Sequence, residues 1–88
     1  MKIKIEELTG EEIRQKNIKE WPIWQKEISR FDWFYESPEE CLLLEGKVTV
    51  KSDFETVTFG KGDFVTFPKG LRCVWEITKP VKKHYNFL

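Results

Sequence analysis

Residues 62–77 read GDFVTFPKGLRCVWEI, in which two apolar runs flank a turn signal. Phe64–Phe67 and Leu71–Thr78 are rich in aromatic and β-branched residues, a composition that is typical of strands. The Pro-Lys-Gly sequence between them consists of residue types that tight turns prefer. This stretch therefore predicts a strand, a turn and a second strand, and it indicates an all-β chain.

Short apolar runs of the same kind extend over most of the chain. We expect the sequences Glu45-Gly46 and Ser52-Asp53, and also Pro80, to separate one strand from the next. Short strands at even spacing predict a β-sandwich or barrel. Together with an N-terminal strand, about eight or nine strands are expected, the others being Ile23–Ile28, Phe31–Tyr35, Cys41–Leu44, Lys47–Lys51, Phe54–Phe59 and Val81–Phe87.

The N-terminal segment has a different pattern. Ile3 and Ile5 alternate with charged residues, which indicates a short half-buried strand. Thr9 and Glu12 have the spacing of a capping box, in which each side chain bonds the backbone N–H of the other residue. We expect one short helix here, which runs to Ile18, and no other helix.

The composition restricts the classes of protein to which the chain can belong. Its 88 residues suit a single domain, residues 1–88. Fifteen basic residues balance fifteen acidic ones, which argues against a nucleic-acid-binding surface. No apolar run reaches the ~18 residues that span a membrane, and no signal-peptide pattern is present, so we expect no membrane partner and a cytoplasmic protein. In that compartment Cys41 and Cys73 are expected to be free thiols.

Two segments carry a resemblance to a known family. Glu39 and Gly46, within EECLLLEG, resemble the end of the first cupin box, and GDFVTFPKGLRC resembles the second box. Together with WPIW, FDWFY, GLRCVW and KKHY, they look most like the small one-domain cupins related to ureidoglycine aminohydrolase domains and ethanolamine-utilization protein Q. The resemblance implies an antiparallel double-stranded jelly-roll barrel.

The resemblance also implies where a metal would bind, and the sequence departs from the family there. Cupins hold a divalent metal with two histidines spaced HxH, a glutamate and a third histidine. The register of the resemblance places at these positions Trp33, Tyr35, Glu39 and Cys73. Because aromatic side chains are poor ligands, we expect neither a metal nor another cofactor. The alternative is a substitute divalent-metal site made of Glu39, Cys73 and Tyr35.

The two-residue period of strands indicates which side chains enter the barrel together. Side chains that share the inner face of neighbouring strands would line a small-molecule pocket at the barrel mouth. The candidate catalytic residues are Glu39 and Cys73. The candidate substrate-binding residues are Trp33, Tyr35, Cys41, Trp75 and Lys83, and Tyr85 shares the face of Lys83.

Each of these residues also has a purely structural explanation. The aromatic side chains can fill a barrel that has lost its metal, and Cys73 can be a small buried thiol. Glu39 requires a partner if it is buried, and we expect this partner to be Tyr35, Lys83 or Arg72.

Three further polar residues are expected outside the pocket. Asp63 follows a glycine in a turn, where aspartate commonly bonds the backbone. Arg72 and His84 alternate with pocket-facing residues, so we expect both side chains to face the surface.

The sequence leaves three functions open. The first is an enzyme or binder that acts on a small polar metabolite in an aromatic-lined pocket. The second is a metal-dependent cupin with altered ligands, and the third is a non-catalytic interaction module. We expect a homodimer in each case, because exposed strand edges invite pairing.

Overall fold

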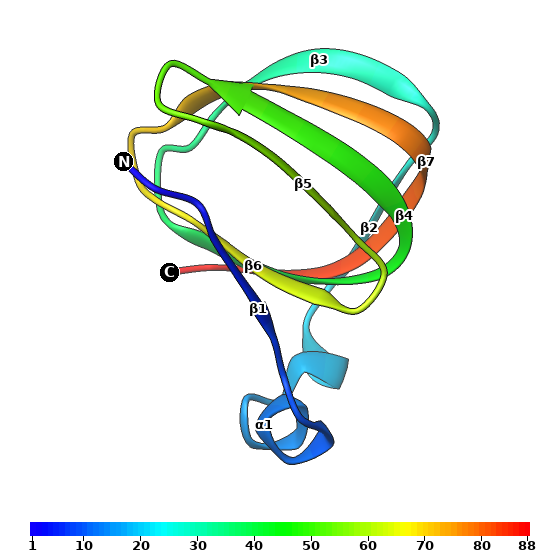
Figure 1. Ribbon diagram of the computed structural model, residues 1–88. Helices are drawn as coiled ribbons and strands as arrows, with labels where there is room; N and C mark the ends of the chain where they lie inside the picture. The colour runs from blue at the N-terminus through cyan, green and yellow to red at the C-terminus, as the bar shows by residue number, and fades with distance from the viewer.

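The computed structural model describes residues 1–88, and its strands curl into a roll with one short helix outside it (Figure 1). This confirms the prediction of an all-β antiparallel jelly roll with an N-terminal helix. Neither α1 nor η1 has the length and apolar character of a membrane-spanning helix. The elements are β1 (Lys4–Glu7), α1 (Gly10–Gln15), the 3₁₀ turn η1 (Ile18–Glu20), β2 (Ile23–Lys26), β3 (Ser29–Phe34), β4 (Glu39–Ser52), β5 (Thr56–Gly60), β6 (Asp63–Phe67) and β7 (Arg72–Phe87).

Strands β4 and β7 form the spine of the roll, and they lie antiparallel along almost their whole length (Figure 1). On its other edge β4 pairs with β6 over residues 39–42 and with β5 over residues 47–51. Strand β7 likewise pairs with β3 over residues 72–77 and with β2 over residues 81–84. Both long strands therefore belong to two half-sheets, one completed by β3 and β5 and the other by β1, β2 and β6.

Gly46 and Pro80 mark the bend at which the long strands pass between the half-sheets. The β4–β7 register shifts in steps from Leu43 to Val48, which is the irregularity of a β-bulge. The φ of Gly46 is 107°, and a Cβ at this position would lie 2.5 Å from the carbonyl oxygen of Pro80. The prediction that Glu45-Gly46 and Pro80 end strands was therefore wrong. A bulge accommodates a positive φ and a missing N–H within one continuous strand, so the strands are fewer and longer than expected.

The capping box of the N-terminal helix is present. The hydroxyl oxygen of Thr9 accepts from the N–H of Glu12 at 3.1 Å, and the Glu12 carboxylate accepts from the N–H of Thr9 at 3.0 Å. The helix ends at Gln15, earlier than expected, because Asn17 adopts the left-handed conformation with a φ of 54°. Ile18 is then fully buried in a small apolar cluster apart from the main core.

A turn ties the segment after β3 to the strands of the second box. The N–H of Gly70 donates to the carbonyl oxygen of Tyr35 at 2.7 Å. The N–H of Tyr35 donates to the carbonyl oxygen of Leu71 at 2.9 Å. Gly70 has a φ of 86°, which favours glycine in this turn. These two bonds fix the backbone of Tyr35 beside the start of β7. Its side chain belongs to the main apolar core of the roll.

Candidate functional site

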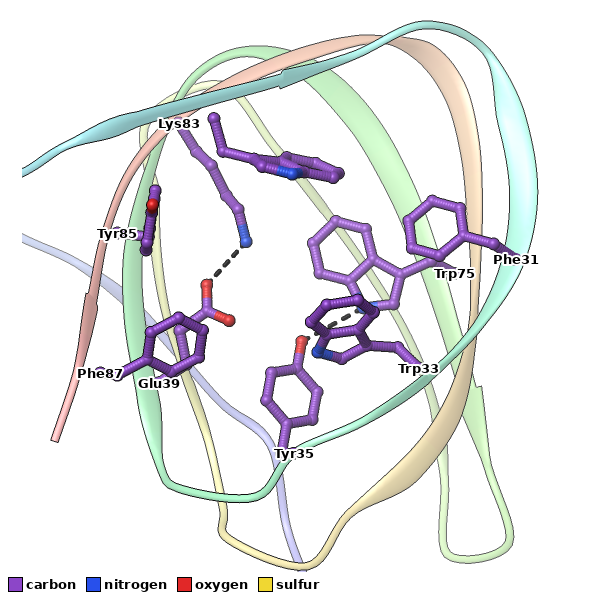
Figure 2. A pocket seen from close by; sticks show the side chains of 9 residues that line it. Phe31, Trp33, Tyr35, Glu39, Trp75, Lys83, Tyr85 and Phe87 are labelled. Atoms are coloured by element: carbon purple, nitrogen blue, oxygen red, sulfur yellow. Dashed lines mark hydrogen bonds and ion pairs between the residues drawn. The ribbon is translucent and has the colours of Figure 1, made fainter.

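A cavity of about 210 Å³ lies within the roll, and its wall is mostly aromatic (Figure 2). Strand β2 supplies one residue, β3 two, the segment after β3 one, β4 one and β7 four. Trp33 and Phe87 are 46% and 50% exposed, so the cavity reaches the protein surface beside them. The lining residues are Trp24, Phe31, Trp33, Tyr35, Glu39, Trp75, Lys83, Tyr85 and Phe87.

An ion pair between Glu39 and Lys83 provides the charge in the cavity. The Nζ atom of Lys83 donates to Oε2 of Glu39 at 2.7 Å, and the two side chains are only 7% and 4% exposed. This confirms that Glu39 has a hydrogen-bond donor, which is Lys83. The ammonium also lies 5.0 Å from the Trp24 ring centroid and 4.7 Å from that of Trp75. The cation–π contacts and the carboxylate together compensate for the burial of the ammonium.

Both members of the pair retain unused hydrogen-bonding capacity. Oε2 of Glu39 accepts from Lys83, whereas Oε1 has no protein donor and points into the cavity (Figure 2). Every side-chain nitrogen or oxygen that is shut off from solvent has a partner, so Oε1 lies where solvent reaches it. The Lys83 ammonium uses one of its three N–H groups on protein. The cavity thus presents free acceptor and donor groups within an apolar wall.

Tyr35 adds a hydroxyl that is held in place. Its ring stacks on Phe67 with centroids 4.6 Å apart, and its oxygen accepts from Nε1 of Trp75 at 3.2 Å. Burial, and then the negative charge of Glu39, hold the pKa of Tyr35 well above its ordinary value. The hydroxyl therefore keeps its proton at neutral pH and can donate it to a ligand.

The aromatic walls also contact one another. Phe31 stacks on Trp75 with centroids 5.9 Å apart, and Trp24 meets Trp75 edge-on at the same distance. Trp33 meets Tyr35 edge-on at 6.4 Å. Because each ring is held by a neighbour, the cavity is largely preformed, and a ligand would cost little rearrangement.

The two cysteines do not line this cavity, and the expectation that they would was wrong. Alternation gives the face of a strand but not the position along the barrel, and Cys41 is completely covered by core residues. Burial raises the pKa of Cys41 to about 12. Cys73 lines a separate surface cleft, and burial, then the charge of Glu39, raises its pKa to about 11. Both groups are thiols rather than thiolates at neutral pH.

The residues at the expected metal positions do not fit a divalent metal. The roll contains no cluster of three His, Cys, Asp or Glu side chains that could hold one. The Trp33 side chain has no acceptor atom to offer a cation, and Glu39 is bonded to an ammonium whose charge would repel one. The substitute site of Glu39, Cys73 and Tyr35 has the same difficulty.

The remaining polar predictions had mixed outcomes. Asp63 accepts from the N–H of Gly60 at 2.9 Å, as expected of a turn residue. Arg72 faces outward, with its guanidinium 5.0 Å from the Phe34 ring centroid. His84 faces away from the cavity as expected, but its surface placement was wrong: it is buried, with Nδ1 2.9 Å from the carbonyl oxygen of Trp21.

Sequence reasoning missed three lining residues. Phe31 lies two positions before Trp33 on β3, and Phe87 lies two positions after Tyr85 on β7, so alternation could have identified both. Trp24 lies directly opposite Lys83 in the β2–β7 pair. This pairing is a tertiary relationship, and no local signal gives it.

Known proteins share both the sequence pattern and the fold. The family of EutQ-like cupin domains matches residues 14–85. A DUF861-family protein of Thermotoga maritima is 49% identical, with a TM-score of 0.97 over 99% of this chain and 100% of that protein. No curated protein sequence matches the chain.

Two more distant structures share the fold alone. The EutQ protein of Clostridium difficile is 15% identical, with a TM-score of 0.66 over 94% of this chain and 64% of that one. A cupin-superfamily protein of Desulfitobacterium hafniense is 11% identical, with a TM-score of 0.61 over 99% of this chain and 77% of that one. The likeness therefore extends over nearly the whole length of this chain.

Proposed function

The chain belongs to the EutQ-like cupin domain family, and from this premise we propose that its barrel cavity binds a small polar metabolite without a metal. The observation that carries the proposal is the Glu39–Lys83 pair, which keeps a free carboxylate oxygen and free N–H groups inside an aromatic wall. A mostly apolar hollow with a few convergent polar groups is the common form of a small-molecule site.

The size and charge of the cavity define the kind of ligand. Its volume of about 210 Å³ suits a small molecule better than a large cofactor or a polymer. Glu39 and Lys83 already neutralise each other, and an added net charge would be costly in this setting. The ligand is therefore neutral or zwitterionic, with donor and acceptor groups for the pair and an apolar face for the rings.

The pair is better explained by binding than by stability. Replacing a buried ion pair by well-packed apolar side chains is often neutral or stabilising, so a core needs no such pair. The Tyr35 hydroxyl, which is fixed by Trp75, adds a third polar group to the same cavity. Three preorganised polar groups in one hollow favour a specific ligand over simple core filling.

We further propose a cytoplasmic homodimer. Both cysteines are free, which suits a reducing compartment. Strands β2 and β3 bond to β7 along one edge only, and Ile28 between them is 62% exposed. An open strand edge beside exposed apolar side chains favours pairing with a second copy.

The binding proposal is tested by titrating small neutral and zwitterionic metabolites while the tryptophan indole N–H signals are followed by NMR. A ligand should shift the signals of Trp24 and Trp75, and the shift should be lost in Lys83→Met. Lys82→Met is the matched control, because Lys82 is adjacent on β7 and does not line the cavity. Shifts that survive in Lys83→Met, or that occur only outside the cavity, would refute the proposal.

A further inference from the structure

We propose that Lys83 is a covalent catalyst whose amine condenses with the carbonyl carbon of a small aldehyde or ketone to form an iminium. Glu39 serves as its acid–base partner. This inference rests on the proposed function, because it names the class of metabolite that the cavity takes and the reaction that begins there.

The surroundings of Lys83 are those of a reactive amine. It is the only buried lysine of the chain, and its side chain points into the cavity (Figure 2). Its ammonium lies 5.0 Å from the centroid of the Trp24 ring and 4.7 Å from that of Trp75. Lysines that form imines with carbonyl substrates are typically desolvated in apolar pockets. The side chain has one hydrogen bond to protein and lines the cavity, so a molecule in the cavity can approach its nitrogen.

Glu39 is placed to move the protons that the reaction requires. Its Oε2 lies 2.7 Å from Nζ, so it can take a proton from the ammonium and leave a neutral amine. The amine nitrogen then bonds to the carbonyl carbon, and a proton passes from that nitrogen to the former carbonyl oxygen. The protonated Glu39 then gives its proton to the resulting hydroxyl, which leaves as water.

The step is balanced in atoms and in charge. The ammonium and the carbonyl compound become the iminium and one water molecule, and Glu39 ends as the carboxylate with which it began. The positive charge stays on the nitrogen of Lys83, where the carboxylate and the two indole rings already stabilise a cation. The buried ion pair is thus preserved from reactant to product.

Tyr35 can assist the same step as a donor. Its hydroxyl lines the cavity with the pair and keeps its proton at neutral pH. A hydrogen bond from this hydroxyl to the carbonyl oxygen would favour the negative charge that develops there during attack.

The inference is tested by reductive trapping with glycolaldehyde or hydroxyacetone and sodium cyanoborohydride, followed by mass spectrometry of the intact protein and of its peptides. We expect one adduct, on Lys83, before any of the exposed lysines react. Lys82→Arg should keep the adduct, and Lys83→Arg should lose it. At saturating probe, Glu39→Gln should slow trapping by about a hundredfold, because acid–base assistance is lost.

The wild-type peptide map decides the matter without any variant. Adducts spread evenly over the exposed lysines would overturn the inference. So would a probe that shifts the Trp24 and Trp75 indole signals but leaves no adduct on Lys83, although binding would then stand. A protein whose indole signals respond to no compound of the titration would overturn the binding proposal as well.

Discussion

Nζ of Lys83 lies 2.7 Å from Oε2 of Glu39 inside the roll, although 44 residues separate them in the chain. Removing one partner leaves a buried charge alone, so Glu39→Leu should lower the free energy of unfolding by about 3–5 kcal/mol. The double variant Glu39→Leu/Lys83→Met removes both charges and should regain most of that loss, while it binds no ligand. Urea unfolding gives the free energy of unfolding of both variants. If the double variant were as unstable as the single variant, the hypothesis that the pair serves binding rather than stability would be contradicted.

Gly46 should tolerate alanine poorly. Gly46 has a φ of 107°, and an added Cβ would lie 2.5 Å from the Pro80 carbonyl oxygen. Because both effects disfavour a side chain, Gly46→Ala should lower the free energy of unfolding by about 2–5 kcal/mol. Gly62→Ala is the matched control, because Gly62 has a φ of 91° but open space around it, and it should cost about 1–2 kcal/mol. Equal losses in the two variants, measured by urea unfolding, would show that the contact with Pro80 is unimportant.

Stability should fall at alkaline pH because of the Cys41 thiol. Burial raises its pKa from about 9 to about 12 in the folded protein, so the folded state retains a proton that the unfolded state releases. The protonated thiol therefore makes its full contribution to the free energy of unfolding below pH 9. As the pH rises from 9 toward 12, this free energy falls by about 1.4 kcal/mol per pH unit. Cys41→Val lacks the thiol and should show a shallower fall between pH 9 and 11. Identical pH profiles of unfolding would exclude this role of Cys41.

The proposed homodimer should dissociate when charge is placed at the β2–β3 edge. Ile28→Glu should give monomers by light scattering at concentrations where the wild type is dimeric, because a carboxylate would be desolvated in the interface. Phe54→Glu is the control, since Phe54 is 63% exposed, close to the 62% of Ile28, but lies in the β4–β5 turn. A wild type that is monomeric throughout, or a dimer unaffected by Ile28→Glu, would refute the predicted interface.

Strand alternation predicted much of the cavity wall, and its failures have a common cause. Trp33, Tyr35 and Trp75 lie around the cavity because a period of two fixes the face on which a side chain lies. The same period placed Cys41 and Cys73 with them, yet it does not say how far along the barrel a residue lies or what covers it.

Gly46 and Pro80 were correctly recognised as irregular backbone positions, but the conclusion that they end strands was wrong. Gly46 does require a conformation that only glycine adopts easily, and Pro80 does interrupt regular pairing. A turn and a bulge make the same local demands, so the sequence does not distinguish a chain reversal from a bend. What distinguishes them is the partner strand, because β4 and β7 bend at the same point.

The passage of β4 and β7 through both half-sheets makes the roll a cooperative unit. Neither half can open alone, because it would take with it strands that pair in the other half. Denaturation should therefore be a single all-or-none transition without a half-folded intermediate. Folding must also wait until residues 39–52 meet residues 72–87, and such distant pairing makes a chain slow to fold for its size.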